Sequence, residues 1–292
     1  MKIYFGSACV HLTEKVNLEK GNLLTKKFSN GETYIKILGK PENCFLVQST
    51  KTDSDIVELI LALDAFNDCG VKPNLIIPYF GYSKQDKRFQ EGEAISAKAL
   101  ARVFAERAQK IFLIDPHIFR GEGEFEYYGT AMETVSSISL LAEHAKKFVS
   151  NPIILAPDLK ASALAEKFQK ILGGETFAFE KERESGKALG EIYEAKVSEV
   201  SGEISCAGRD VLIVDDMIVT GGTIVKAIEK IRAQKPAKIF VAAVHGAFTE
   251  GALEKILAVG ASKVFTTDTI KNPTAEVSIA QLIERIVKSY ET

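Results

Sequence analysis

The feature that most limits the fold of this chain is a series of short apolar runs rich in β-branched residues. They recur along the 292 residues at Leu75–Ile77, Ile111–Ile114, Ile153–Leu155, Val211–Val214, Ile239–Val244 and Val264–Phe265. Continuous apolar runs of this kind are typical of strands buried on both faces of a parallel sheet. The stretches between them show helical spacing, as in Ile56, Leu59, Ile60, Leu63 and Phe66. Strand and helix in repeated alternation predict an α/β fold with mainly parallel sheets flanked by helices.

The length of the chain favours two domains over one. Ser150, Asn151 and Pro152 break the pattern near the middle, between a predicted helix and a new strand. We place the boundary before that helix, which predicts an N-terminal domain of residues 1–137 and a C-terminal domain of residues 138–292. The final helix, with one apolar face, could pack on either domain.

Composition argues against several classes of partner. The formal net charge is −2 and no block is rich in Lys and Arg, which disfavours nucleic acid and anionic membranes. The N-terminus lacks the long apolar core of a signal peptide, and no apolar run approaches the ~20 residues that span a bilayer. We therefore expect a cytoplasmic protein whose partners are small molecules. Zinc and redox sites are not indicated, because the cysteines, Cys9, Cys44, Cys69 and Cys206, form no CxxC pair.

Polar residues follow several of the apolar runs. Asp115 and His117 follow the second run, Asp158 the third and the pair Asp215 and Asp216 the fourth, while His245 follows the fifth. In open α/β sheets, ligands bind beyond the carboxyl ends of the strands. These residues are therefore candidates for a functional site.

The most specific motif runs from Val211 to Thr223 and joins an apolar strand, two acids and a glycine-rich turn that opens a helix. The start of a helix offers unpaired backbone N–H groups and a positive dipole end, which favour a phosphate. Asp215 and Asp216 stand just before this turn, where carboxylates can accept hydrogen bonds from sugar hydroxyls. A capped helix with solvated acids would be the bland interpretation, but the unbroken order of the three parts favours a sugar-phosphate site.

This motif resembles the phosphoribosyl-pyrophosphate loop of type I phosphoribosyltransferases and of ribose-phosphate pyrophosphokinases. Val219 stands where the family usually has an acid, which removes one possible contact. The resemblance implies two phosphoribosyltransferase-like domains, of which the C-terminal one binds ribose 5-phosphate. The implied ribose 5-phosphate residues are Arg183, Asp215, Asp216, Val219, Thr220, Gly221, Gly222 and Thr223.

Two N-terminal segments resemble the ATP-binding motifs of the pyrophosphokinases. Phe28-Ser-Asn-Gly-Glu32 is similar to Phe-x-Asp-Gly-Glu, and Tyr82-Ser-Lys-Gln-Asp86 is similar to Tyr-x-Arg-Gln-Asp. Locally, Asn30-Gly31 predicts a type I′ hairpin turn, and Lys84 in place of Arg loses the planar fork that binds bidentately. The implied ATP-binding residues are Phe28, Asn30, Gly31, Glu32, Lys84, Gln85 and Asp86.

The same resemblance implies a metal site. Asp115-Pro-His117 matches the family's Asp-x-His, and Asp158 resembles its second metal-linked carboxylate, which makes His117 and Asp158 the expected metal residues. The residues after Asp158, Leu159-Lys160-Ala161, depart from the family's glycine-rich pyrophosphate loop. Mg²⁺ bound together with ATP is the expected cofactor, since carboxylate and triphosphate oxygens are hard ligands.

A charged segment over 180–187 resembles the mobile catalytic loop of the pyrophosphokinases, in which Lys-x-Arg closes over the reacting phosphates. Lys181 and Arg183 match that spacing and are the expected catalytic residues. By composition alone this segment would be a solvated turn.

The motifs together predict an enzyme that transfers the pyrophosphoryl group of Mg-ATP to the C1 hydroxyl of ribose 5-phosphate, giving 5-phosphoribosyl 1-pyrophosphate and AMP. The family shares its ATP site between subunits, which implies a homo-oligomer, at least a dimer. Two alternatives stay open: a phosphoribosyltransferase that consumes phosphoribosyl pyrophosphate, and a non-catalytic regulatory subunit of the same fold. The first leaves the two ATP-like segments unexplained, and the second is kept open by the departures at Lys84, Lys160 and Val219.

Overall fold

The chain folds into two compact units. The computed structural model describes residues 1–119, 121–182, 196–200 and 205–290, with the side chains of 180–182 and 196–200 left out. The first unit contains Met1–Ser137, Asp268–Pro273 and the segment from Ser278 that includes the last helix, and the second contains Ile138–Thr267 and Thr274–Val277. None of the helices in these ranges combines the length and apolar character needed to cross a bilayer.

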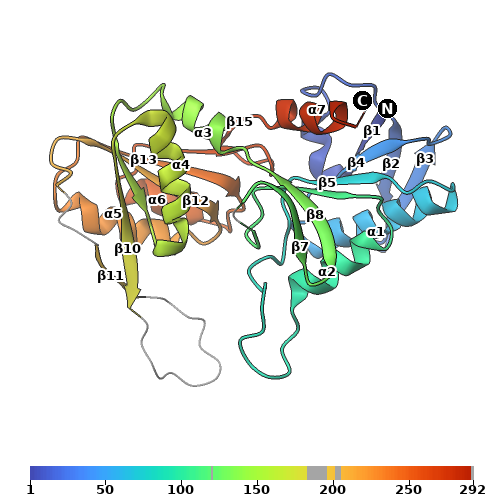
Figure 1. Cartoon of the computed structure of the whole chain (residues 1–292), viewed down its shortest axis with the longest axis horizontal. Helices are drawn as coiled ribbons and strands as arrows, with labels where there is room; N and C mark the ends of the chain where they lie inside the picture. Colours follow the sequence, from blue (N-terminus) through green and yellow to red (C-terminus); the bar gives the residue numbers. More distant parts are fainter. Residues whose placement is uncertain (120, 183–195, 201–204, 291–292) are drawn as a thin grey trace. The chain divides into compact units, whose positions relative to one another are not determined.

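The first unit is built on a six-stranded sheet (Figure 1). Its strands, in spatial order, are β1 (Lys2–Phe5), β4 (Cys44–Val47), β5 (Asn74–Ile77), β6 (Ile111–Ile114), β8 (Thr130–Val135) and β7 (Gly123–Tyr127). Neighbouring strands pair in parallel from β1 to β8, and β7 pairs antiparallel with β8. A separate hairpin is formed by β2 (Asn22–Lys27) and β3 (Thr33–Leu38).

One face of this sheet is covered by α1 (Asp53–Asp68) and α2 (Ser96–Ala105), which share a core with alternate strand residues such as Leu46, Leu75 and Leu113. Helix α1 begins at a capping box: Thr52 accepts the N–H of Asp55, and the Asp55 carboxylate accepts the N–H of Thr52. A short 3₁₀ helix, η1 (Ser7–Leu12), follows β1.

The C-terminal segment belongs to this first unit. The Asp268 carboxylate is buried and accepts hydrogen bonds from Lys15 Nζ at 2.7 Å and from the Ile279 N–H at 2.8 Å. Helix α7 (Ala280–Lys288) follows, and beyond it the Tyr290 ring packs edge-on against Phe45 and Phe112 at centroid distances of 5.9 and 5.3 Å. The sequence placed residues 138–292 in the C-terminal domain but left open on which domain the final helix packs, and these contacts hold the C-terminal segment on the first sheet.

We predict that Tyr290→Ala lowers the stability of the first unit by about 2–3 kcal/mol, because it removes ring contacts with two core aromatic residues. Calorimetric unfolding of the whole chain measures the loss. Tyr290→Phe, which keeps the ring, should unfold within a degree or two of the wild type. An alanine variant as stable as the wild type would show that Tyr290 does not anchor the C-terminal segment.

The second unit is built on a seven-stranded sheet. Its strands, in spatial order, are β11 (Lys196–Val200), β10 (Glu175–Glu182), β9 (Ile153–Ala156), β12 (Asp210–Ile218), β13 (Lys238–Gly246), β14 (Lys263–Thr267) and β15 (Ala275–Val277). All neighbours are parallel except β10 and β11. The apolar runs of the sequence therefore form the central strands, as expected for strands with both faces covered.

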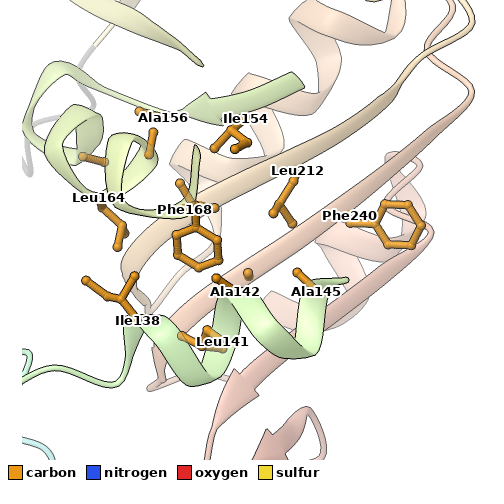
Figure 2. Packing of buried hydrophobic residues seen from close by; sticks show 14 of the residues in the cluster. Ile138, Leu141, Ala142, Ala145, Ile154, Ala156, Leu164, Phe168, Leu212 and Phe240 are labelled. Atoms are coloured by element: carbon orange, nitrogen blue, oxygen red, sulfur yellow. The ribbon is translucent and has the colours of Figure 1, made fainter. Parts of the chain in front are cut away.

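Alternate residues of these strands enter two different cores. Ile154 and Leu212 pack with α3 (Ile138–Ala145) and α4 (Ser162–Leu172) on one face, where Phe168 fills the centre of the cluster (Figure 2). Ile153 and Val211 point to the opposite face and pack with α5 (Gly222–Arg232) and α6 (Ala252–Ala258). The two-residue period of a strand thus buries both sides of the sheet, and the predicted α/β architecture is confirmed.

Candidate functional site

Strand β12 carries the paired acids. The sequence predicted that the strand ends at Val214, with the acids beyond it, but β12 continues to Ile218 and contains both acids. The reason is its neighbour: Val211–Ile213 pair with β9, whereas pairing with β13 extends to Ile218 opposite Gly246. The acids therefore lie on a part of the strand that extends past β9 and is held by β13. His245, expected after its strand, likewise lies within β13, opposite Met217.

Asp215 lies close to two other acids, Asp216 and Asp158, so that the negative charges of these carboxylates repel that of Asp215. The Asp215 carboxylate accepts the N–H of Asp216 at 2.9 Å, and Asp216 accepts the N–H of Met217 at 2.9 Å. Burial raises the pKa of Asp215 well above its ordinary value, and the negative charges of Asp216 and Asp158 raise it further. A ligand that donates hydrogen bonds or brings positive charge would relieve this cost.

We predict that Asp215→Asn stabilises the free protein by an amount that depends on pH. An unfolded aspartate titrates near pH ~3.9, whereas folded Asp215 keeps its proton to higher pH, so the wild type loses stability as pH rises between these two values. The melting temperature of the variant should therefore exceed that of the wild type by a margin that grows above pH ~4 and then levels off.

Asp210→Asn, at the opposite end of the same strand, controls for the loss of one charge. A difference in melting temperature between Asp215→Asn and the wild type that stays constant across this pH range would contradict the electrostatic explanation.

The glycine-rich turn follows β12 and opens α5. Gly221 has a left-handed backbone with φ 75°, and it precedes the helix without a side-chain cap. Among the residues that the structure describes, a Cβ atom at Gly222 would meet only the Thr220 hydroxyl, at 3.8 Å, which leaves open space beside Gly222. Thr220 is exposed and Thr223 half-buried. Uncapped N–H groups, hydroxyls and open space at a helix start suit a phosphate group.

This turn rests on a segment that the sequence did not single out. A Cβ atom at Gly221 would lie 3.0 Å from Cδ1 of Ile256 and 3.3 Å from the Ala252 carbonyl oxygen, both on α6. The carbonyl oxygen of Val219 accepts two hydrogen bonds from Thr249, from its N–H at 2.9 Å and from its hydroxyl at 3.2 Å. Thr249 follows β13, so its position beyond a strand end was the available signal.

Asp158 follows β9 and begins a short 3₁₀ helix, η2 (Leu159–Ala161). Its Oδ1 accepts the N–H of Ala161 at 3.1 Å. Asp158 is close enough to Asp215 to raise the pKa of that carboxyl group. The expected metal residue of the second unit therefore lies beside the paired acids. The N–H of Ala161 therefore already has an acceptor within the protein. This N–H lies in Leu159-Lys160-Ala161, the segment that departs from the family's glycine-rich loop.

In the first unit, the segment from Phe28 to Glu32 forms the tip of the β2–β3 hairpin. The predicted type I′ turn at Asn30-Gly31 is wrong: Lys27 pairs with Thr33, which leaves a five-residue loop. Within it the Gly31 N–H donates to the Phe28 carbonyl oxygen at 2.9 Å, and Asn30 Oδ1 accepts the Glu32 N–H at 3.1 Å. The Phe28 side chain is 54% exposed at this tip and is accessible for stacking.

The segment from Tyr82 to Asp86 follows β5 and meets the same helix as the hairpin. The Tyr82 hydroxyl donates to the Asp53 carboxylate at the start of α1, and Lys27 Nζ, next to the hairpin loop, contacts the Ser54 hydroxyl at 2.6 Å. Both predicted ATP segments are thus tied to the first turn of α1. Lys84 is exposed.

Gln85 has a local structural role. The hydroxyl of Ser96, the first residue of α2, donates to Gln85 Oε1 at 2.6 Å. The main-chain carbonyl of the next residue, Asp86, accepts the Tyr127 hydroxyl at 2.7 Å. These bonds hold the segment in place and leave the Asp86 carboxylate half-buried.

His117 lies two residues after Asp115 at the end of β6 and is half-buried. Asp115 itself is occupied, because its Oδ2 accepts both the N–H and the hydroxyl of Ser137 at 2.6 Å. This acid ties β6 to the end of β8 and has a left-handed backbone with φ 39°. His117, the residue of the Asp-x-His motif that the sequence assigned to the metal, thus lies just beyond an acid that is fixed by Ser137.

The structure describes the expected catalytic residues only in part. Lys181 lies in β10, of which the backbone is described, whereas Arg183 lies outside the described residues. Among the described residues, no group of three or more His, Cys, Asp or Glu side chains is arranged to hold a metal ion.

A parallel sheet whose central strand carries paired acids and leads into a glycine turn at a helix start defines the second unit as a phosphoribosyltransferase-type domain. Residues 135–280 match the family model described as phosphoribosyl transferase domain, and residues 1–107 match the N-terminal domain of ribose phosphate pyrophosphokinase. The chain belongs to the ribose-phosphate pyrophosphokinase family.

Individual relatives agree with this assignment. The chain is 33% identical over 294 residues to the ribose-phosphate pyrophosphokinase of Pyrococcus abyssi, covering 98% of this chain and 99% of the relative. It is 36% identical over 269 residues to that of Methanothermobacter thermautotrophicus, covering 90% of both chains. The fold matches the crystal structure of phosphoribosylpyrophosphate synthetase from Mycobacterium smegmatis with a TM-score of 0.79, 21% identity and coverage of 99% and 98%.

Proposed function

We propose that this chain synthesises 5-phosphoribosyl 1-pyrophosphate from Mg-ATP and ribose 5-phosphate, releases AMP, and serves nucleotide biosynthesis in the cytoplasm. The observation that carries the proposal is the junction of β12 and α5, where paired acids precede an uncapped helix start. Family membership supports synthesis over consumption of the product, because the match includes the N-terminal domain of pyrophosphokinases as well as the transferase domain.

Ribose 5-phosphate would bind along this junction. Its phosphate would accept hydrogen bonds from the first N–H groups of α5 and from the hydroxyls of Thr220 and Thr223, since a helix start attracts an anion. Its ring hydroxyls would donate to Asp215 and Asp216. The raised pKa of Asp215 supports this arrangement, because hydroxyl donors would stabilise carboxylates that now repel one another.

ATP would bind to the segments tied to α1 in the first unit. The exposed Phe28 ring suits stacking on adenine, with Glu32 available to its amino group. Lys84 would supply a cation for the phosphates, as a point charge without the bidentate geometry of Arg. The family resemblance adds Asn30, Gly31, Gln85 and Asp86 to this site, and adds a homo-oligomer, at least a dimer, to the proposal.

Mg²⁺ fits the donor atoms of the second unit. Asp158 and Asp216 both lie within electrostatic range of Asp215, so the acid cluster carries an excess of negative charge on hard oxygen atoms. Asp158 would hold the ion together with oxygens of the nucleotide, and the family resemblance also assigns a metal-binding role to His117. When bound, Mg²⁺ would neutralise the charge of the triphosphate.

The reaction requires an in-line approach more than covalent chemistry from the protein. The C1 oxygen of ribose 5-phosphate attacks the β-phosphorus of ATP and loses its proton to water, while the bond from the β-phosphorus to the oxygen of the α-phosphate breaks and AMP leaves with that oxygen. Lys181 and Arg183 would supply positive charge to the transferred group, and Arg183 would also contact ribose 5-phosphate.

Incubation of the pure protein with Mg-ATP and ribose 5-phosphate tests the proposal. Equal amounts of AMP and phosphoribosyl pyrophosphate are expected. Folded protein that yields neither product, yet binds ribose 5-phosphate, would favour a non-catalytic subunit. Consumption of added phosphoribosyl pyrophosphate with a free base would favour a phosphoribosyltransferase.

We predict that Lys181→Ala lowers kcat by about 10²–10³ while the Kd for ribose 5-phosphate, measured by calorimetry, changes little, because the lost charge acts on the transition state. Lys187→Ala, in the same charged segment of the sequence, serves as the control for a general loss of charge. Equal losses of turnover and of ribose 5-phosphate binding in Lys181→Ala would contradict the catalytic assignment.

A further inference from the structure

Thr249 contacts the phosphate-binding turn but belongs to no motif that defines the site. Its N–H and its hydroxyl both donate to the carbonyl oxygen of Val219, at 2.9 and 3.2 Å. Its own carbonyl oxygen accepts the Ala252 N–H at 3.1 Å, at the start of α6. Thr249 therefore joins the turn to the helix on which Gly221 rests.

We propose that Thr249 is a positioning residue for ribose 5-phosphate, holding the peptide between Val219 and Thr220 in the orientation that phosphate binding requires. This inference rests on the proposed function. It assigns the hydroxyl of Thr249 an effect on sugar-phosphate affinity without direct contact with the substrate.

The planarity of the peptide unit gives the mechanism. In a trans peptide the C=O and the following N–H point in opposite directions. Because the Val219 carbonyl is held towards Thr249, the Thr220 N–H points to the opposite side of the turn. If this peptide rotated, the Thr220 N–H and the hydroxyl of the same residue, which borders the open space beside Gly222, would change position together.

Gly221, on the other side of this peptide, lies too close to α6 to move so as to offset a rotation of the peptide. Gly221 is in a left-handed conformation with φ 75°, and a Cβ atom added there would lie 3.0 Å from Cδ1 of Ile256 and 3.3 Å from the Ala252 carbonyl oxygen. The turn is thus held at two points: by packing at Gly221 and by two hydrogen bonds at Val219. The side chain at position 219 takes no part in these two hydrogen bonds, because Thr249 donates to the main-chain carbonyl oxygen. A valine at this position can therefore hold the turn in the same way as an acidic residue.

Thr249→Val tests the proposal, because it removes the hydroxyl, keeps the side-chain shape and leaves the backbone N–H bond in place. A hydrogen bond of this kind corresponds to about a 3- to 10-fold change in an equilibrium constant. We expect the Kd for ribose 5-phosphate, measured by calorimetry without nucleotide, and its KM to rise by about that factor. The KM for ATP should stay at its wild-type value, the melting temperature should fall by no more than about 2–4 °C, and Thr249→Ser, which keeps the hydroxyl, should restore binding to within about twofold.

The outcomes separate this inference from the function on which it rests. Wild-type protein that fails to bind ribose 5-phosphate contradicts the proposed function itself. Wild-type protein that binds it, with Thr249→Val equal to wild type, overturns only the role of Thr249. A valine variant that loses stability and affinity for both substrates alike, without recovery in Thr249→Ser, also overturns it, since that pattern indicates a general structural role.

Discussion

The pairing of β12 with β13 is the interaction on which the candidate site depends. It continues to Ile218 and Gly246, while the pairing of β12 with β9 ends at Ile213. One neighbour therefore supports the acidic end of β12, and the other leaves room for Asp158 beside it. The same pairing brings the segment after β13 beneath the glycine turn, so that Thr249 and α6 can hold it. The paired acids, the glycine turn and Asp158 thus lie close together because β12 and β13 are both longer than β9.

Most of the architecture was predictable because it depends on burial. Apolar runs such as Val211–Val214 must be covered on both faces, and only parallel strands between helices achieve this repeatedly. Strand ends were less predictable, since Asp215 and Asp216 are polar and yet remain in β12 through main-chain pairing with β13. The apolar pattern of a sequence reflects the burial of side chains. The end of a strand depends instead on how far its main-chain hydrogen bonds to a neighbouring strand continue.

Turn geometry and long-range contacts account for the remaining differences. The two-residue turn of positive φ predicted at Asn30-Gly31 occurs instead at Tyr128-Gly129, between β7 and β8, with φ values of 50° and 78°. At the hairpin tip, Asn30 binds the Glu32 N–H and the loop widens. The anchoring of the C-terminal segment by Lys15 and Asp268 joins residues far apart in the chain, which no local pattern reveals.

The central claim is that the start of α5 binds the phosphate of ribose 5-phosphate. The most direct test is an NMR titration of isotope-labelled protein with ribose 5-phosphate in the absence of nucleotide, following the amide resonances of Thr220, Gly222 and Thr223. If the phosphate binds there, these resonances should shift together and saturate with the dissociation constant obtained by calorimetry. Saturable binding that leaves these amides unchanged and shifts resonances elsewhere would contradict it.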